Sequence, residues 1–525
     1  MKPLIYSAIM IVGVLFGFHI AKSNGVSSIS KDTGNFSCIN DIFSLIDKEY
    51  VDTVNMDELQ VKAVTHVLES MDPHSEYIKP DILNDINDNL HANFEGIGVS
   101  FRIEKDTITI ITTIKGGPSE KVGILAGDRI VYVDDSLVAG TKVTNKTAMS
   151  LLKGPKKTKV NVKVKRQGVA DLLDFTITRD VIPNYSLDVA YMIDDEIGFI
   201  KLTKFSQTTH KEFVEAVRKL RSEGMTKLIL DLRGNTGGYL GEAVGIADEM
   251  LKDNKLIVYT EGEHRDRSYI FARHRGLWED NDIAVLIDEG SASASEIVAG
   301  ALQDNDRGVI IGRRSYGKGL VQEQFDLGDN GAIRLTVARY YTPTGRCIQK
   351  PFTGNKAEYL LEEYARYETG EMFNIDSIHF ADSLKYVTPG GRTVYGGGGI
   401  MPDIYVPLEN DSTRYFFNKM ANSSILFQYA FDYSDIHRHD ILKYGDVRRF
   451  NEEFVFTDAM FDEMMRRAEE KKINGTDADK ARARELSEPL FKAYVARNVF
   501  GDEAFYPIYE PMDEILQEAL KEIRD

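Results

Sequence analysis

An alternation of strand-like and helix-like segments between Asp194 and Ile311 constrains the fold of this chain more than any other feature. The apolar runs with the length of buried strands are 197–205, 227–232, 256–259, 283–287 and 309–311. The helical stripes between them are 210–221, 240–251 and 296–303. Chains that alternate strands with helices in this way fold into an α/β core with a largely parallel sheet. We therefore expect such a core at 182–354.

A second β-rich segment precedes this core. Alternating apolar residues occur at 108–110 and 160–164, and between them lie Gly-Gly-Pro-Ser at 116–119 and Ala-Gly-Asp-Arg-Ile at 126–130. The pattern resembles a PDZ domain spanning 91–181. The resemblance implies that the loop Gly96-Ile97-Gly98-Val99 offers backbone N–H groups to the terminal carboxylate of a peptide, which adds a strand to the sheet edge. The alternative is a small β-barrel whose glycines serve only as turns.

The N-terminal end of the chain differs from the middle. After Lys2, an apolar run at 4–21 is marginal in length for spanning a bilayer and long for the apolar region of a signal peptide. We expect residues 1–22 to be an uncleaved membrane anchor or a cleaved signal peptide, and either one implies export. Residues 23–90 have the pattern of a linker followed by a small helical region.

The C-terminal end is charged and helical in its spacing. We expect solvated helices packed on the core over 355–525. A glycine-rich loop at 396–407 interrupts this segment and leads into a short strand, and we expect it to return to the α/β core.

Composition excludes several classes of function. The 525 residues include 64 Lys and Arg against 82 Asp and Glu, and the formal charge of −18 argues against nucleic acid as a partner, because phosphate binding requires a basic face. The two cysteines, Cys38 and Cys347, are too few for a disulfide framework or a Cys-rich metal site, and we expect the thiols to be independent. No His-Glu-x-x-His motif occurs either, so we expect no metal site. We also expect no organic cofactor.

The stretch 290–297, Gly-Ser-Ala-Ser-Ala-Ser-Glu-Ile, joins a predicted buried strand to a predicted helix. Ser293 and Glu296 have the Ser-x-x-Glu spacing of a capping box, which satisfies free N–H groups at a helix start. The same N–H groups and the positive end of the helix dipole could instead hold a developing oxyanion. Capping and catalysis are therefore competing interpretations of Ser293.

The loop 312–322 mimics a phosphate-binding loop, Gly-x4-Gly-Lys, as far as Lys318. Gly319 stands where Ser or Thr would hold magnesium, and β-like sequence follows instead of a helix, so we reject nucleotide binding. Lys318 and Gln322 are four residues apart, so on a strand both would face the same side. A lysine in a desolvated pocket loses its charge more easily and can act as a base toward a serine. No Gly-x-Ser-x-Gly elbow supports a Ser-His-Asp site.

Several ordered motifs together resemble the C-terminal processing peptidases, also called tail-specific proteases. The matching motifs are Asp72-Pro73-His74-Ser75, Asp231-Leu232-Arg233 with Gly237-Gly238, Ser291 to Glu296, Gly317-Lys318-Gly319, and Gly399 to Asp403. They cover roughly 36–351 and the 396–407 loop, and the helical region beyond matches no motif of that family. One departure from the family pattern is Gly234-Asn235-Thr236, which concerns the fine geometry of its loop.

The resemblance implies a set of roles. Ser293 would be the nucleophile, Lys318 the general base and Gln322 the residue that positions the base. The backbone N–H groups of Gly238 and Ala294 would form the oxyanion hole.

We therefore expect an α/β multidomain protein with an N-terminal helical unit, a PDZ domain, an α/β serine-peptidase core and a helical C-terminal extension. It would be an exported serine endopeptidase, at the periplasmic face of the inner membrane, that recognises protein or peptide substrates by their C-termini and cleaves them through an acyl-enzyme. A homo-oligomer and an adaptor protein are both left open. A non-catalytic PDZ adaptor with a protease-like fold is the main alternative. An acyl-CoA hydratase-like enzyme would share the oxyanion hole at a helix end without needing the PDZ domain.

Overall fold

The computed structural model describes most of the chain, namely residues 37–90, 93–273, 275–328, 330–409 and 411–524. The chain divides into two compact units, Met1–Val67 and Leu68–Asp525. Helix α2 (Ser37–Glu49) lies in the first unit, and helix α3 (Met56–Met71) begins there. The apolar run expected to be an anchor or signal, at 4–21, lies outside the described residues. Among the helices of the described ranges, none has the length and apolar character needed to cross a bilayer.

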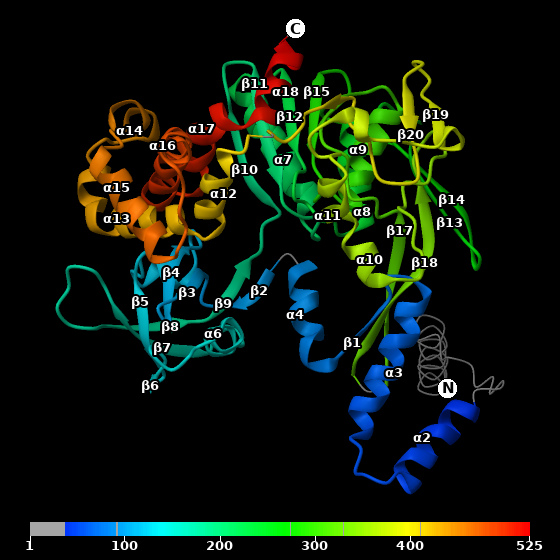
Figure 1. Cartoon of the computed structure of the whole chain (residues 1–525), viewed down its shortest axis with the longest axis horizontal. Coiled ribbons are helices and arrows are strands. Elements are labelled where there is room, and N and C mark those ends of the chain that lie inside the picture. Colours follow the sequence, from blue (N-terminus) through cyan, green and yellow to red (C-terminus); the bar gives the residue numbers. More distant parts are fainter. Residues whose placement is uncertain (1–36, 91–92, 274, 329, 410, 525) are drawn as a thin grey trace, which may run out of the picture. The chain divides into compact units, whose positions relative to one another are not determined.

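An antiparallel β-structure with two short helices follows helix α4 (Pro80–Leu90) (Figure 1). Its main sheet has the order β3-β4-β5-β7-β8, with β6 paired to β5, and a separate ladder joins β2 to β9. The elements are β2 (Asn93–Gly96), β3 (Val99–Glu104), β4 (Thr107–Thr113), α5 (Pro118–Lys121), β5 (Arg129–Val133), β6 (Ser136–Leu137), α6 (Asn145–Leu152), β7 (Lys159–Lys165), β8 (Leu173–Thr178) and β9 (Asp180–Pro183). The alternating residues Ile108, Ile110, Val160 and Val164 are fully buried, as their spacing predicts. Strand β3 lies at one edge of the sheet.

The central sheet of the next segment has the order β10-β11-β12-β15-β16-β21. Its strands are β10 (Leu187–Met192), β11 (Ile197–Leu202), β12 (Lys227–Asp231), β15 (Asp282–Ile287), β16 (Val309–Gly312) and β21 (Ile404–Tyr405). Every neighbouring pair from β11 onward is parallel, and β10 is antiparallel to β11. The prediction of an α/β core with a largely parallel sheet is confirmed. Strand β21 brings the segment 396–407 beside β16.

Helices cover both faces of this sheet because successive strand residues point to opposite sides. Leu228 and Leu230 of β12 pack in one cluster with helices α7 (Thr209–Glu223), α8 (Leu240–Met250) and α9 (Ala294–Asp304). Ile229 of the same strand packs in another cluster with the C-terminal helix.

That C-terminal helix, α18 (Glu514–Arg524), carries a single apolar face, and it lies against the sheet on β15 and β16 (Figure 1). The residues of this face are Ile515, Leu516, Ala519, Leu520 and Ile523, and all are buried. We expected solvated helices packed on the core here, and helix α18 does pack on the sheet. Its buried face supplies a second layer of the α/β core.

A second, antiparallel sheet stands beside the parallel one. It has the order β1-β18-β13-β14, with β17 also paired to β18. Its strands are β1 (Glu76–Ile78), β13 (Leu256–Gly262), β14 (Arg265–Phe271), β17 (Leu320–Asp326) and β18 (Ala332–Tyr341). We expected the run 256–259 to be a strand of the parallel core. This prediction is wrong, because the run begins β13 of the antiparallel sheet. The short turn between β13 and β14 forms a hairpin, and a hairpin joins antiparallel strands only.

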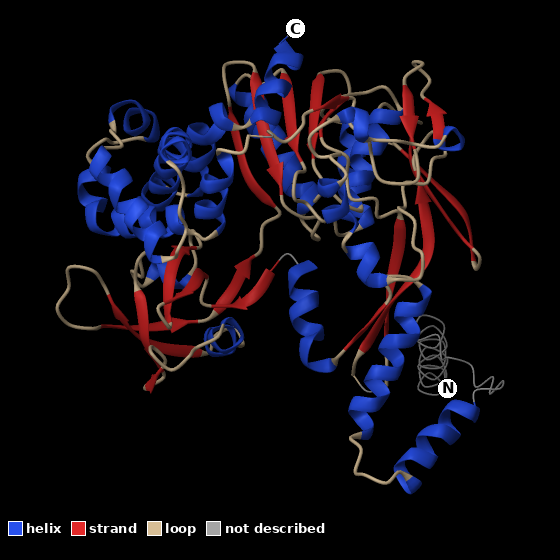
Figure 2. Ribbon diagram, in the orientation of Figure 1, coloured by secondary structure: helices blue, strands red, loops and turns tan. Residues whose placement is uncertain are grey.

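The remaining C-terminal elements are mainly helical (Figure 2). They comprise α10 (Lys356–Leu360), α11 (Glu362–Glu368), the hairpin of β19 (Lys385–Val387) and β20 (Thr393–Tyr395), and then α12 (Arg414–Asn422), α13 (Ile425–Leu442), α14 (Val447–Glu453), α15 (Asp458–Glu470), α16 (Asp477–Phe500) and α17 (Phe505–Tyr509). Helices α12 to α17 enclose their own core, in which Phe450, Phe491 and Met464 are fully buried. This independent core explains why the segment can be both highly charged and folded.

Candidate active site

Three serines lie at the start of helix α9, and they differ in burial and in hydrogen bonding. Ser291 and Ser295 are fully buried, and their hydroxyls donate to the carbonyls of Leu232 at 2.9 Å and Asn235 at 2.8 Å. Ser293 is partly exposed and lines a cavity of about 690 Å³. Within the described part of the chain its hydroxyl makes no capping hydrogen bond of standard geometry. Ser293 is therefore the serine of the three that a substrate can reach.

The backbone of Ser293 is strained. Its φ of 54° and ψ of −111° lie outside the usual regions for a residue with a side chain, at a cost of about 1–3 kcal/mol. Such a conformation persists only where neighbours determine it. The N–H of Ala292 donates to Asn235 O at 3.0 Å, and the N–H of Ser293 donates to Glu296 Oε2 at 2.8 Å.

The fully buried carboxylate of Glu296 joins the serine segment to the lysine loop. Glu296 Oε2 accepts the N–H of Lys318 at 2.9 Å as well as that of Ser293, and Oε1 accepts the N–H of Gly317 at 2.7 Å and the hydroxyl of Ser315 at 2.5 Å. Burial raises the pKa of Glu296, and these hydrogen bonds oppose the rise. The predicted capping interaction is thus one part of a larger function, which is to hold the two loops in register.

Lys318 and Gln322 are in direct contact. Lys318 Nζ donates to Gln322 Oε1 at 2.8 Å, and Lys318 lines the same cavity as Ser293. Burial lowers the pKa of the Lys318 amine, and the charge of Arg334 lowers it further. Among the residues that the structure describes, no hydrogen bond joins Lys318 Nζ to the Ser293 hydroxyl. The two groups share a cavity, and contact between them requires a local adjustment of either side chain.

The reason predicted for the Lys318–Gln322 contact is wrong. We expected both side chains on one face of a strand, but β17 begins at Leu320, two residues after the lysine. Its pairing with β18 also shifts register between Val321 and Gln322. An irregularity of this kind re-aims the side chain that follows it, and here it turns Gln322 toward the lysine loop.

Two backbone N–H groups beside Ser293 have no acceptor among the described residues. The N–H of Gly237 donates to Asn235 Oδ1 at 2.9 Å, whereas those of Gly238 and Ala294 reach no acceptor in the described ranges. A Cβ on Gly237 would lie 2.8 Å from Ser293 Cβ, so only glycine allows the two loops to approach this closely. An oxyanion formed on the substrate of Ser293 would find donors of the required kind here.

Asn235 is a site residue whose importance the sequence did not indicate. It is fully buried, and its Nδ2 donates to Leu202 O at 2.9 Å while its Oδ1 accepts the N–H of Gly237. Its carbonyl also accepts the hydroxyl of Ser295. Asn235, which belongs to the departure from the family pattern at Gly234-Asn235-Thr236, therefore holds the glycine loop in place through hydrogen bonds. The signal that could have identified it is an Asn two residues before a glycine, which favours an Asx turn.

Tyr340 was also missed. Its hydroxyl donates to the carbonyl of Lys318 at 2.5 Å and lies 3.1 Å from the carbonyl of Ser293. It comes from β18, and no local sequence signal separates it from the other aromatic residues of that strand.

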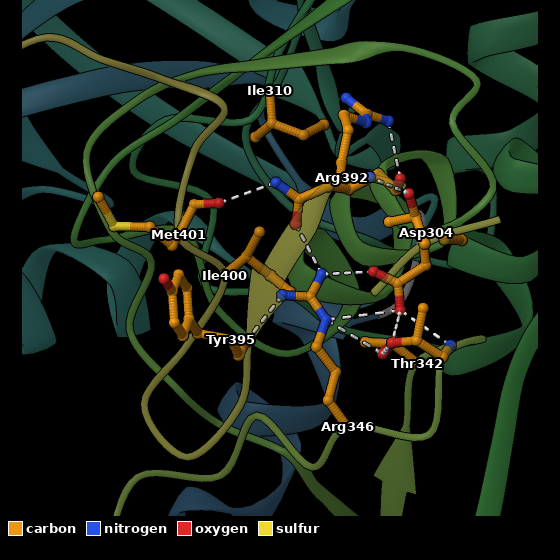
Figure 3. A network of polar contacts seen from close by, with 12 residues as sticks. Asp304, Ile310, Thr342, Arg346, Arg392, Tyr395, Ile400 and Met401 are labelled. Carbon is orange, nitrogen blue, oxygen red and sulfur yellow. Dashed lines mark hydrogen bonds and ion pairs between the residues drawn. The ribbon is translucent and has the colours of Figure 1, made fainter. Parts of the chain in front are cut away.

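A buried ion pair supports the far end of helix α9 (Figure 3). Arg346 Nη2 lies 2.6 Å from Asp304 Oδ1, and both side chains are fully buried. Arg346 Nη1 donates to Tyr395 O at 2.8 Å, and Gln303 Nε2 donates to Met401 O at 2.8 Å. The network ties the helix that carries Ser293 to the segment 396–407.

The same segment also reaches the lysine loop. The N–H of Ser315 donates to Ile400 O at 3.0 Å, and the N–H of Ile400 donates to Ser315 Oγ at 2.6 Å. Since Ser315 in turn contacts Glu296, the glycine-rich loop supports the carboxylate that joins nucleophile and base.

The loop predicted to bind a peptide carboxylate borders a second cavity, of about 330 Å³, between β3 and α6. Its lining includes Ile97, Val99 and Leu152, together with Gly96 and Gly98. The N–H groups of Ile97 and Gly98 meet no acceptor in the part of the chain that is described, and Gly98 has a φ of 73°. Free N–H groups in such a turn suit an anion, and the apolar lining suits a side chain next to it.

Metal ligands do not gather anywhere in the described ranges, where no group of three or more His, Cys, Asp or Glu could hold an ion. Cys38 and Cys347 are both free thiols in this structure.

Comparisons with known proteins agree with this arrangement. A PDZ domain family model matches residues 96–177, one for peptidase family S41 matches 196–356, and one for a family of unknown function, DUF8443, matches 416–501. The chain is 37% identical over 313 residues to a carboxy-terminal-processing protease of Bartonella bacilliformis, a match that covers 59% of this chain and 71% of that protein.

It is also 33% identical over 346 residues to the carboxy-terminal processing protease CtpA of Bacillus subtilis, covering 65% of this chain and 72% of that protein. Among solved structures, a photosystem II D1 C-terminal processing protease matches with a TM-score of 0.35 and 24% identity, covering 70% of this chain and 92% of that one.

Proposed function

Because the chain belongs to the carboxy-terminal processing proteases of peptidase family S41, we propose that it is an endopeptidase that cleaves polypeptides with a Ser293–Lys318 dyad. The observation that carries this proposal is the shared cavity. Ser293 is the accessible serine of its segment, and it lines that cavity together with a lysine whose pKa is lowered.

The reaction follows from the groups around the cavity. Neutral Lys318 takes the proton of the Ser293 hydroxyl while Oγ attacks the scissile carbonyl carbon, and Gln322 holds the amine in place. The carbonyl oxygen becomes negative and is stabilised by the N–H groups of Gly238 and Ala294. The lysine then gives its proton to the departing amine, which leaves an acyl-enzyme on Ser293. Water hydrolyses that ester with the same base, so the step needs no metal or other cofactor.

The PDZ domain is the proposed site of substrate selection. A substrate C-terminus would add a strand to the edge strand β3 and place its carboxylate on the N–H groups of the Gly96–Val99 loop. Binding of matched free-acid and amidated peptides to full-length Ser293→Ala tests this, and amidation should weaken binding at least about tenfold through loss of the anion. Equal binding of both peptides would show that the domain does not read the carboxylate.

Export is proposed from the apolar run that follows Lys2, which would place the catalytic part at the periplasmic face of the inner membrane. Protease accessibility of the full-length protein in spheroplasts tests it. Protection of the protein in intact spheroplasts would contradict export.

Substitution of Lys318 tests the dyad. Arginine keeps the positive charge but does not deprotonate at working pH, so Lys318→Arg should be nearly as inactive as Lys318→Ala in peptide cleavage and in labelling of Ser293 by a fluorophosphonate. Substantial activity of Lys318→Arg would eliminate lysine as the base. Absence of Ser293 labelling in the wild type would favour a non-catalytic adaptor.

A further inference from the structure

The Asp72-Pro73-His74-Ser75 motif has no role in the reaction as described, yet it contacts the residue that holds the lysine. Gln322 Nε2 donates to the backbone carbonyl of His74 at 2.8 Å, while Gln322 Oε1 accepts from Lys318 Nζ at 2.8 Å. One amide group thus joins the turn to the base.

The His74 carbonyl determines which end of that amide faces Lys318. A carbonyl oxygen can only accept, so it selects the NH2 end of Gln322 and turns Oε1 toward the lysine. A neutral lysine that donates one N–H to Oε1 keeps its lone pair free for the proton of Ser293. In the flipped amide, Nε2–H would donate to that lone pair, and the base would be occupied.

Asp72 holds the His74 carbonyl in place. Asp72 Oδ1 accepts the N–H groups of His74 and Ser75, both at 2.8 Å, and Ser75 Oγ donates to Asp72 Oδ2 at 2.5 Å. Buried Ser75 Oγ also accepts the N–H of Thr336 at 3.1 Å, which fastens the turn to β18. The turn is therefore closed on itself and anchored to the sheet that also contains β17.

The imidazole of His74 provides a second connection to the base. His74 Nε2 lies 2.9 Å from Tyr359 Oη, which accepts Gln349 Nε2 at 3.0 Å. Gln349 Oε1 accepts the N–H of Gly319 at 2.9 Å, so this chain of contacts ends at the residue after Lys318. The backbone and the side chain of His74 thus converge on the same lysine.

We propose that the Asp72–Ser75 turn positions the catalytic base by holding the Gln322 amide, through the His74 carbonyl, in the orientation that leaves the Lys318 lone pair free. The proposal rests on the Ser293–Lys318 chemistry proposed above. Asp72 is then a positioning residue, because it acts through His74 and Gln322 and not on the reacting atoms.

A double-mutant cycle between Asp72 and Gln322 in the full chain tests this proposal. The rate of Ser293 labelling by a small fluorophosphonate is followed by mass spectrometry over hours, so that slow reactions stay measurable. We expect Asp72→Ala and Gln322→Ala each to slow labelling about tenfold or more, and the double variant to be slower than Gln322→Ala by no more than about twofold. Asp72→Asn, which keeps an acceptor oxygen for the turn, should recover most of the rate.

A matched control exists at Asp194. Its Oδ1 accepts the N–H groups of Glu196 at 3.0 Å and Ile197 at 2.8 Å, in a turn of the same kind that lies outside the cavity lining. Asp194→Ala should lower the melting temperature by an amount similar to that of Asp72→Ala while leaving the labelling rate unchanged. Should Asp72→Ala fail to fold, Ser75→Ala makes a smaller change in the same turn and carries the same cycle.

Two results would overturn the proposal. In one, the fold-reductions in labelling rate caused by Asp72→Ala and Gln322→Ala multiply in the double variant. In the other, Asp72→Ala is labelled at the wild-type rate. Failure of the underlying chemistry gives a different result. In that case the wild type is not labelled at Ser293, or Lys318→Arg is labelled as fast as the wild type, and the positioning proposal falls with it.

Discussion

Arg233 and Asp513, which are 280 positions apart, face each other as a bidentate ion pair. Arg233 Nη1 lies 2.7 Å from Asp513 Oδ1, and Arg233 Nη2 lies 2.7 Å from Asp513 Oδ2. The same guanidinium also donates twice to Asp231, a buried carboxylate. Burial alone would raise the pKa of Asp231, but Arg233 and Lys201 hold that pKa well below its ordinary range. The ion pair therefore fixes the C-terminal segment to the loop that leads to Gly238.

Removal of Asp513 should weaken both the fold and the reaction. Asp513→Ala leaves Arg233 with one carboxylate partner, and we expect the free energy of unfolding to fall by about 1–3 kcal/mol because the pair is mostly buried. Loosening of the glycine loop should also lower the labelling rate of Ser293. Chemical denaturation and labelling kinetics measure the two effects.

The control for Asp513 is Asp502, which pairs with Arg497 at 2.7 Å on an exposed surface. Asp502→Ala should change the free energy of unfolding by less than about 1 kcal/mol and leave labelling unchanged. Equal effects of the two substitutions would contradict a specific role for the Arg233–Asp513 pair.

The three serines should respond differently to alanine. Ser293→Ala should abolish proteolysis and labelling while the protein stays folded, because among the described residues the Ser293 hydroxyl makes no capping hydrogen bond of standard geometry, and even a full helix cap contributes only about 1 kcal/mol. Ser291→Ala and Ser295→Ala should stay active but lose about 0.5–1.5 kcal/mol of unfolding free energy, since each removes one buried hydrogen bond while its carbonyl acceptor keeps a backbone N–H partner. An inactive Ser295→Ala beside an active Ser293→Ala would show that the nucleophile is misassigned.

The pH dependence of the labelling rate should follow the deprotonation of Lys318. Its pKa is lowered by burial, so the labelling rate of the wild type should rise with pH through a midpoint below the ~10.4 of a free lysine. Gln322→Glu places a negative charge beside the amine, favours ammonium and should move that midpoint upward. A midpoint that moves downward in Gln322→Glu would argue against lysine as the titrating group.

Gly98 should be sensitive in the PDZ domain. A Cβ there would lie 3.1 Å from Ile182 Cδ1 at a φ of 73°, so Gly98→Ala should distort the loop and weaken the binding of a free-acid peptide about tenfold. Gly140 has a similar φ of 76° and no neighbour within 4 Å of a Cβ, which makes Gly140→Ala the control for strain alone. If calorimetry finds the same loss of peptide affinity in Gly98→Ala and Gly140→Ala, a specific function of the Gly98 loop is excluded.

Acid should destabilise the protein through His74. Burial, with Lys318 nearby, lowers the pKa of His74 to about 4 from an ordinary value near 6.5. The unfolded chain therefore binds this proton first as the pH falls, so stability present above pH ~6.5 is lost progressively toward pH ~4. Because solvent screens the partly exposed ring, we expect the free energy of unfolding to fall by about 2 kcal/mol over this pH range. Urea unfolding at both ends of this range, compared with His74→Gln, measures it, and an equal acid loss in His74→Gln would contradict the assignment.

Local patterns determined much of this protein from sequence alone. The period-two alternation at Ile108 and Ile110 and the alternating strands and helices after Asp194 depend on neighbours within one element, so they predicted the β-rich domain and the parallel core. For Ser293 the local pattern left capping and catalysis open, and the roles of Ser293 and Lys318 as nucleophile and base came from the resemblance to a family of peptidases.

Tertiary structure alone decided the contacts that make the site specific. The run 256–259 joined a second sheet because of a hairpin partner, and Gln322 reached Lys318 through a shift in strand register. Helix α18 became part of the core because the sheet had a second apolar face, and that packing carries Asp513 to Arg233. Contacts of this kind depend on surfaces that exist only after the chain has closed on itself, and no window of neighbouring residues contains them.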